Sequence, residues 1–151
     1  MLFRSGWADD GEEVSVQFQG QRVTTVAKDG LWMVRLNSLR ASAEPEVMKV
    51  SGKNRVQVND VLVGEVWVCS GQSNMEWPLS KAFESQVDIA ASSNPQIRLY
   101  SVPKLKANEP ASDIKGVAWL KCEPVNSTWF SAVGYYFGRR SEEHTSELQS
   151  H

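Results

Sequence analysis

Histidine, cysteine and long apolar runs are all scarce in this chain of 151 residues. Its two histidines, His144 and His151, both lie in the last eight residues. The two cysteines, Cys69 and Cys122, allow one internal disulfide at most and make no zinc site without other ligands. No apolar run approaches the roughly 20 residues of a membrane-spanning helix, and residues 1–10 lack the pattern of a signal peptide. We therefore expect no membrane partner, and the localisation stays open.

A basic cluster is also missing. Lysine and arginine together number 16 against 18 aspartates and glutamates, which gives a net charge of -2. Nucleic-acid binders usually carry a concentrated positive surface, so we expect no nucleic-acid partner. The sequence contains no glycine-rich phosphate loop and no cluster of metal ligands, so we expect no cofactor and no metal. Hydrophobic residues make up 41% of the chain, enough for one domain or parts of two.

The first part of the chain alternates between apolar and polar residues. Val14, Val16 and Phe18 share one face of an extended segment, and Trp32, Val34 and Leu36 repeat the pattern. Further strands are predicted at 23–26, 46–50 and 55–58, with turns at Gly20-Gln21, Asp29-Gly30 and 51–54. Residues 11–63 therefore predict a run of antiparallel strands packed as a β-sandwich.

The pattern changes at residues 61–69. The second half of this segment is a nearly continuous apolar run, which is typical of a strand covered on both faces in a parallel α/β sheet. Further strands are predicted at 97–102 and 117–121, separated by a loop over 103–116. A helix capped by Ser80 and ended by Asn94-Pro95 would carry Phe83, Val87, Ala90 and Ala91 on one side. A second helix, capped by Asn126 or Ser127, would bury a stripe of Trp129, Phe130, Val133, Tyr136 and Phe137.

A serine-rich segment, residues 70–75, follows the predicted buried strand directly. A serine at a strand-to-helix turn projects its hydroxyl from the sheet edge, and its own N–H points into the same crevice, where it can bind an oxyanion. Gly71 suits a tight turn that leaves no room for a Cβ atom. Ser73 is therefore a candidate nucleophile. An ordinary polar loop with a capping serine explains the same pattern, and spacing alone does not decide between the two.

Around this serine the chain reads GEVWVCSGQSNMEWPL over residues 64–79. This stretch resembles the nucleophile block of the sialate O-acetylesterase family, carbohydrate esterases of the SGNH (GDSL-like) hydrolase superfamily. The resemblance extends to GWAD at 6–9, PQIRLY at 95–100 and FSAVGYYFGR at 130–139, and so covers nearly all of residues 6–139.

The resemblance implies three segments: a jelly-roll-like β-sandwich over 1–63 that lacks its first strand, the beginning of a three-layer α/β SGNH domain over 64–139, and a tail over 140–151. It implies that Ser73 attacks an acetyl ester on a sugar and that its amide is one oxyanion-hole donor. Gln72 stands where many relatives carry the aspartate of their G-D-S motif. Gly71, Gln72, Asn74, Glu76 and Trp77 are predicted to contact the substrate or to shape the loop.

The general base that such a serine needs is missing from the sequence. In the family it is a histidine three residues after an acidic partner near the C-terminal end, and glycine and asparagine blocks add oxyanion donors. None of these follows Arg139, so the resemblance implies an N-terminal piece of a longer enzyme that is nearly inactive alone. Ser101 and Lys104 have S-x-x-K spacing, but Pro103 interrupts the helix that would align them, so we interpret this match as coincidence.

The last twelve residues, RSEEHTSELQSH, show no apolar periodicity. Back-translated, they resemble a common short-read sequencing adapter read in frame. We therefore expect residues 140–151 to be read-through and not natural sequence, and we expect neither His144 nor His151 to be the base.

Several residues near the motif admit two interpretations. Trp77 could form the floor of a sugar pocket or pack in the core, and Glu76 could orient a substrate hydroxyl or simply be solvated. Cys69 is predicted to be an inert core thiol or to pair with Cys122. For the whole protein, the alternative substrates are acetylated sialic acid and acetylated xylan. A different class remains open: a non-catalytic carbohydrate-binding or scaffolding β-sandwich module.

Overall fold

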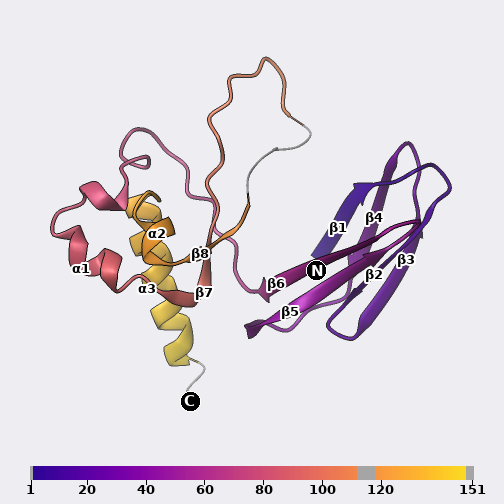
Figure 1. Ribbon diagram of the computed structural model, residues 1–151, viewed down its shortest axis with the longest axis horizontal. Helices are drawn as coiled ribbons and strands as arrows, with labels where there is room; N and C mark the ends of the chain where they lie inside the picture. Colours follow the sequence, from indigo (N-terminus) through magenta and orange to yellow (C-terminus); the bar gives the residue numbers. More distant parts are fainter. Residues whose placement is uncertain (1, 112–117, 149–151) are drawn as a thin grey trace. The chain divides into compact units, whose positions relative to one another are not determined.

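The computed structural model describes the backbone of residues 2–111 and 118–148 and the side chains of residues 4–111 and 118–142 (Figure 1). The chain forms two compact units, Met1–Glu65 and Val66–His151, which we call the β unit and the helical unit. Strands predominate over helices in the described chain.

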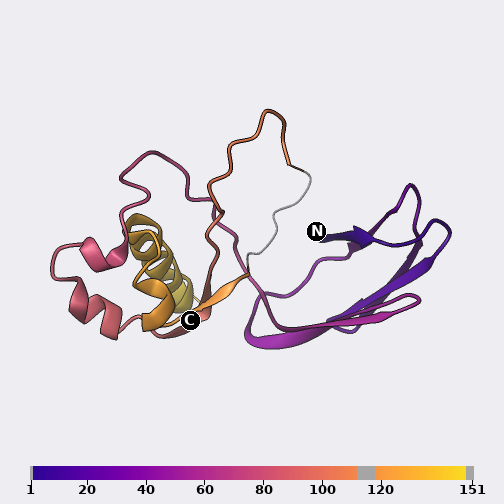
Figure 2. The same ribbon diagram turned by 45° about the horizontal axis from the view of Figure 1, so that its top comes forward.

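The β unit contains six strands in two antiparallel sheets (Figures 1 and 2). Strands β1 and β4 pair with each other, and the other four pair in the order β3-β2-β5-β6. Their bounds are β1 Leu2–Trp7, β2 Glu13–Phe18, β3 Gln21–Val26, β4 Leu31–Leu36, β5 Ser42–Ser51 and β6 Arg55–Val63. The strands predicted from alternation are confirmed, and β1 is an addition that the sequence did not reveal.

Alternation places the core of the β unit as predicted. Along β2 and β4 every second residue is buried. The buried cluster comprises Val14, Val16, Phe18, Ala27, Trp32, Val34, Leu36 and Met48. Asp29 and Gly30 form the predicted turn, both with positive φ, as a tight hairpin requires. The other tight turn is Gln19-Gly20 rather than Gly20-Gln21, because Gln19 and Gly20 are the two residues with positive φ.

The helical unit contains three helices, one 3₁₀ turn and two strands in its described part (Figure 2). Their bounds are η1 Leu79–Lys81, α1 Ser85–Ala90, β7 Asn94–Leu99, β8 Leu120–Cys122, α2 Pro124–Ser127 and α3 Ala132–Leu148. Strands β7 and β8 pair antiparallel, near the two predicted strands. Residues 112–117 lie outside the described residues. They comprise the end of the loop predicted at 103–116 and the first residue of the strand predicted at 117–121.

The predicted buried strand at 64–69 is wrong in this structure. Residues 64–70 form no strand, and Val66 and Val68 are 70% and 89% exposed. A strand exists only where neighbours satisfy its N–H and C=O groups, and no described strand pairs with this segment. The parallel sheet that it would join is therefore absent from the described residues.

The first predicted helix starts later and buries another face. Glu84 adopts left-handed backbone angles (φ 50°) and separates η1 from α1, so Ser80 caps no continuous helix. Phe83 and Val87, predicted to face the core, are 88% and 76% exposed. Ala90 and Ala91 are exposed as well. The buried residues of this segment are Ser85 and Ser92, and Asn94-Pro95 opens β7 instead of ending the helix.

The last helix also differs from its prediction. Its N-cap is Ser131, whose Oγ accepts a hydrogen bond from the Gly134 N–H at 3.1 Å, whereas Asn126 and Ser127 belong to the short α2. The side that packs carries Ala132, Tyr135 and Tyr136, so the predicted stripe is displaced around the helix. Trp129, Val133 and Phe137 stay 75%, 49% and 44% exposed. Helix α3 includes residues 140–148 of the expected tail, and no described helix is long and apolar enough to span a membrane.

Candidate active site

Ser73 lies in a tight turn that connects the irregular segment 64–70 to η1. The N–H groups of Met75, Glu76 and Trp77 donate to the carbonyls of Gln72, Ser73 and Asn74 at 2.9, 3.2 and 3.3 Å. These i→i+3 bonds make a single turn of 3₁₀ type. The N–H groups of Ser73 and Asn74 precede the first donor of the turn and have no backbone acceptor in the described residues. Ser73 and Asn74 are both exposed residues.

The turn is attached to the beginning of α3. Ser131 Oγ donates to Met75 Sδ at 3.4 Å while it caps α3. The Ala132 N–H donates to the Trp77 carbonyl at 2.8 Å, and Pro78 and Ser131 form an antiparallel bridge. The position of the Ser73 turn therefore depends on where α3 starts. This dependence was not visible in the sequence, because residues 75 and 131 are 56 positions apart.

Gly71 is not required by the described surroundings. A Cβ atom at this position would meet only Met75 Cβ, at the ordinary contact distance of 3.4 Å, and the backbone is not in the left-handed region. The expected exclusion of a side chain at Gly71 is therefore wrong for the described part of the chain. Gln72 takes part in shaping the loop through its carbonyl, while the side chains of Gln72 and Asn74 are exposed.

Trp77 and Glu76 lie on the solvent side of the turn. Trp77 is 50% exposed, which excludes the core interpretation; its Nε1 donates to the Lys81 carbonyl at 2.9 Å, and Lys81 Nζ lies 5.6 Å from the ring centroid. Glu76 Oε2 pairs with Lys104 Nζ at 2.6 Å, with both side chains more than half exposed. Lys104 is thus engaged with Glu76, which gives the S-x-x-K spacing no support as a catalytic pair.

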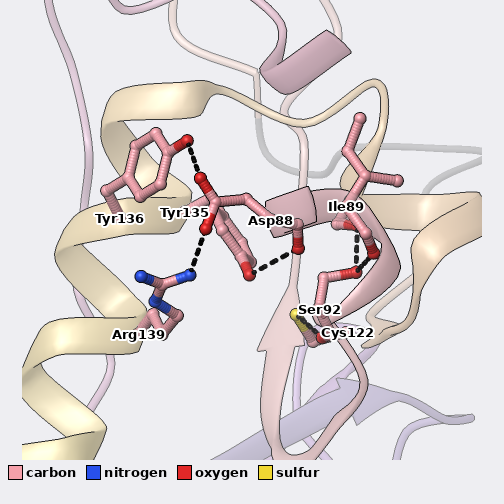
Figure 3. A network of polar contacts seen from close by, with 8 residues as sticks. Asp88, Ile89, Ser92, Cys122, Tyr135, Tyr136 and Arg139 are labelled. Carbon is pink, nitrogen blue, oxygen red and sulfur yellow. Dashed lines mark hydrogen bonds and ion pairs between the residues drawn. The ribbon is translucent and has the colours of Figure 1, made fainter. Parts of the chain in front are cut away.

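A polar network around Asp88 holds α1 against α3 (Figure 3). Tyr136 Oη donates to Asp88 Oδ2 at 2.7 Å and Arg139 Nη1 donates to Asp88 Oδ1 at 2.8 Å. The hydrogen bonds from Tyr136 and Arg139 lower the pKa of the Asp88 carboxyl. The bond to Asp88 raises the pKa of Tyr136 to about 12 and raises the pKa of Arg139. The three side chains therefore stay in their paired forms at neutral pH and link α1 to α3, the helix that Ser131 caps.

Buried hydroxyl and thiol side chains lie beside this network (Figure 3). Ser92 Oγ lies 2.6 Å from Ser127 Oγ, and Cys122 Sγ donates to the Ser92 carbonyl at 3.1 Å. Burial raises the pKa of the Cys122 thiol. Cys69 is exposed and both thiols are free, so the disulfide does not form here and Cys69 is not a core thiol.

No described side chain supplies the imidazole that a catalytic serine needs. The side chains of His144 and His151 lie outside the described residues. The described residues also contain no group of three or more His, Cys, Asp or Glu side chains arranged to hold a metal ion.

Comparison with known proteins gives related sequences and a related structure, although no family model matches the chain. The sialate O-acetylesterases of rat, mouse and human are 33%, 32% and 31% identical to it over 153 aligned positions, which cover 89% of this chain. The crystal structure of a carbohydrate acetylesterase from Xanthomonas citri superposes with a TM-score of 0.92 and 37% identity over 96% of this chain. The chain spans less than a third of the length of the three mammalian relatives and about a third of the solved chain, with shares of 28%, 28%, 29% and 34%. By sequence and by fold, the chain belongs to the sialate O-acetylesterase family.

Proposed function

We propose that this chain carries the nucleophile of a carbohydrate O-acetylesterase and that Ser73 is that nucleophile. The names of the relatives, sialate O-acetylesterase and carbohydrate acetylesterase, support the ester and substrate class. The observation that carries the proposal is the turn itself. It exposes one serine hydroxyl beside two N–H groups without backbone acceptors in the described residues.

The proposed chemistry is acyl transfer in two steps. Ser73 Oγ attacks the acetyl carbonyl carbon and passes its proton to a general base, while the Ser73 N–H donates to the developing oxyanion. The C–O bond to the sugar then breaks, the sugar oxygen takes the proton from the base, and the acetyl group remains on Ser73. Water hydrolyses this acetyl-enzyme to acetate and restores the serine. In this proposal the base is a histidine that is neither His144 nor His151.

The same proposal assigns the two units. The β unit would be an accessory β-sandwich, and residues 64–139 would begin a three-layer SGNH domain. One observation supports the first assignment: the β unit has two sheets around one buried core. Acetylated sialic acid and acetylated xylan are both compatible substrates. Gln72, Asn74, Glu76 and Trp77 would contact the substrate or shape the loop, and Gly71 would allow a close approach of groups outside the described residues.

We further propose that residues 140–151 are encoded by a sequencing adapter and that Arg139 is the last residue of this chain that the natural gene encodes. Genomic DNA sequenced across this position should diverge from the twelve codons after Arg139 and continue into glycine, asparagine and Asp-x-x-His blocks. Genomic DNA that encodes RSEEHTSELQSH would contradict this assignment.

The decisive experiment compares Ser73→Ala with Ser101→Ala in the complete protein encoded at this locus. Ser101→Ala is a matched control because Ser101 is also an exposed serine and belongs to the competing S-x-x-K match. Hydrolysis of an aryl acetate and of acetylated xylan should fall by on the order of 10⁴ to 10⁶ in Ser73→Ala alone. A fluorophosphonate probe should label the parent protein and Ser101→Ala, but not Ser73→Ala. Retained labelling and turnover in Ser73→Ala would refute the proposal.

The 151-residue chain by itself gives a second test. Without a base, it should hydrolyse an aryl acetate at close to the uncatalysed rate. A substantial rate that Ser73→Ala abolishes would show that the base lies within the chain and would overturn that part of the proposal.

A further inference from the structure

The β unit has a shallow depression that the proposed chemistry does not use. Its volume is about 500 Å³, and it is lined by Trp7, Ala8, Asp9, Glu12, Lys53 and Asn54. Trp7 ends β1 and is 69% exposed, which leaves much of a large aromatic side chain open to solvent. Four polar side chains therefore line the same depression as an accessible aromatic one.

The depression is built from two turns that Glu12 holds together. Glu12 Oε1 accepts the Lys53 N–H at 2.7 Å, and Glu12 Oε2 accepts the Asp9 N–H at 3.3 Å. Gly52 is needed for this arrangement, because a Cβ atom there would overlap the Glu12 carboxylate. One carboxylate thus places residue 9 beside residue 53, although the sequence separates them by 44 positions.

Asp9 and Lys53 form an ion pair across the same junction, with 2.5 Å between Oδ2 and Nζ. Their mutual hydrogen bond lowers the pKa of Asp9 and raises that of Lys53, so both stay charged at neutral pH. Both side chains remain more than two-thirds exposed, so a solute with hydroxyl groups can still reach them. The carboxylate accepts hydrogen bonds, the ammonium group donates them, and the Asn54 amide can do both.

Such a combination fits a pyranose ring. The C–H face of a sugar packs on an aromatic ring, while carboxylate, ammonium and amide groups bind its hydroxyls. Two carboxylates and one ammonium group line the depression, so an anionic sugar would meet net negative charge. The charge balance therefore favours a neutral sugar over sialic acid.

We infer that the depression between Trp7, Asp9, Lys53 and Asn54 is a binding site for a neutral pyranose unit of a glycan. The choice of a glycan as the ligand class rests on the proposed function. The choice of a neutral sugar comes from the charges in the depression itself. The β unit would then bind the carbohydrate chain through a site that includes no residue of the Ser73 turn.

The test measures binding of xylohexaose, cellohexaose and an α2,8-linked sialic acid trimer to the 151-residue chain by calorimetry. We expect one of the neutral oligosaccharides to bind and the sialic acid trimer to bind at least tenfold more weakly. Trp7→Ala should weaken binding of the neutral sugar by about tenfold or more, and Trp7→Phe should restore part of it. Trp129→Ala is the matched control, because Trp129 is comparably exposed at 75% in the helical unit, and it should bind as the parent does.

Three outcomes would overturn the inference: no binding of either neutral oligosaccharide, tighter binding of the sialic acid trimer, or equal binding by Trp7→Ala and the parent. Circular dichroism of Trp7→Ala checks that the β unit is still folded, and Asn54→Ala gives a second variant at a surface turn. The measurement does not involve Ser73. If the parent chain binds no sugar while the complete protein hydrolyses esters in a Ser73-dependent way, this site alone is refuted. If the chain binds the sugar but hydrolysis in the complete protein does not depend on Ser73, the proposed function alone is refuted.

Discussion

The two units differ in how many of their apolar residues they bury. The β unit buries a cluster of eight, whereas the buried cluster of the helical unit has five. Among the described side chains, fourteen large apolar residues are exposed in the helical unit, against seven in the β unit. Every strand of the β unit has a hydrogen-bonded partner strand, and four of the six pair with a neighbour in sequence. The segment 64–69 has no partner strand in the described chain. The β unit should therefore be the more self-sufficient part of the molecule.

Phe18→Ala should have the largest effect on stability of the substitutions that compare the two units. Phe18 is 1% exposed in the centre of the β-unit core, so its truncation should cost about 3–5 kcal/mol of unfolding free energy. Met33→Ala, on β4 of the other sheet, is the control. Met33 is 60% exposed, so its truncation should cost less than about 0.5 kcal/mol. Urea unfolding measures the cost of each substitution, and amide exchange in β2 and β4 shows whether the loss of stability is in the β unit. Equal costs for the two variants would show that the β unit has no specific core.

Tyr136→Phe tests the polar network around Asp88 in the helical unit. Loss of the hydroxyl that donates to Asp88 should cost about 1–2 kcal/mol, and Tyr100→Phe should cost less. The folded pKa of Tyr136 is raised from 10.0 to about 12, so its contribution is fully present below pH 10 and is lost as the pH rises to about 12. Tyr136→Phe should therefore flatten the alkaline loss of stability. Tyrosinate absorbance should place this group near its ordinary pKa in Asp88→Asn; no change in that variant would contradict the role of Asp88.

Local patterns predicted the β unit well, because alternation and hairpin turns need no distant information. Val34 and Leu36 are buried where the period-two pattern places them, and Asp29-Gly30 turns where its residue types indicate. The helical unit depends on distant pairs instead. Asp88 meets Arg139 across 51 positions and Ser131 meets Met75 across 56, so neither the buried face of α3 nor its cap could be identified from spacing.

The segment around the candidate nucleophile Ser73 also shows what local sequence patterns fail to predict. The motif around Ser73 was sufficient to identify the family, yet the predicted strand before it is not formed and Gly71 is not crowded. A motif can be matched without knowledge of the contacts that its residues make in the folded chain. Sequence therefore identified the family better than it identified the contacts that position Ser73.

Ser131→Ala would sharpen the link between α3 and the Ser73 turn. The hydroxyl caps α3 and also donates to Met75, so its removal should cost about 1 kcal/mol. Amide exchange should become faster at Gly134 and, through the turn, at Met75 and Trp77. Ser131→Thr keeps the hydroxyl and should restore slow exchange. Faster exchange at Gly134 alone would show that the cap and the turn are independent.

Gly71→Ala should have the smallest effect of these changes. The backbone at Gly71 is not left-handed and a Cβ atom would make only an ordinary contact, so the free energy of unfolding should change by less than about 0.5 kcal/mol. Gly30→Ala is the contrasting variant in the β unit, because a φ of 75° is strained for alanine and should cost about 1 kcal/mol or more. Thermal unfolding of both variants in the 151-residue chain measures the difference. If Gly71→Ala leaves stability unchanged here but lowers ester hydrolysis in the complete protein, the glycine serves the approach of substrate or of further oxyanion donors to Ser73. A destabilised Gly71→Ala chain would instead show that the turn itself requires glycine.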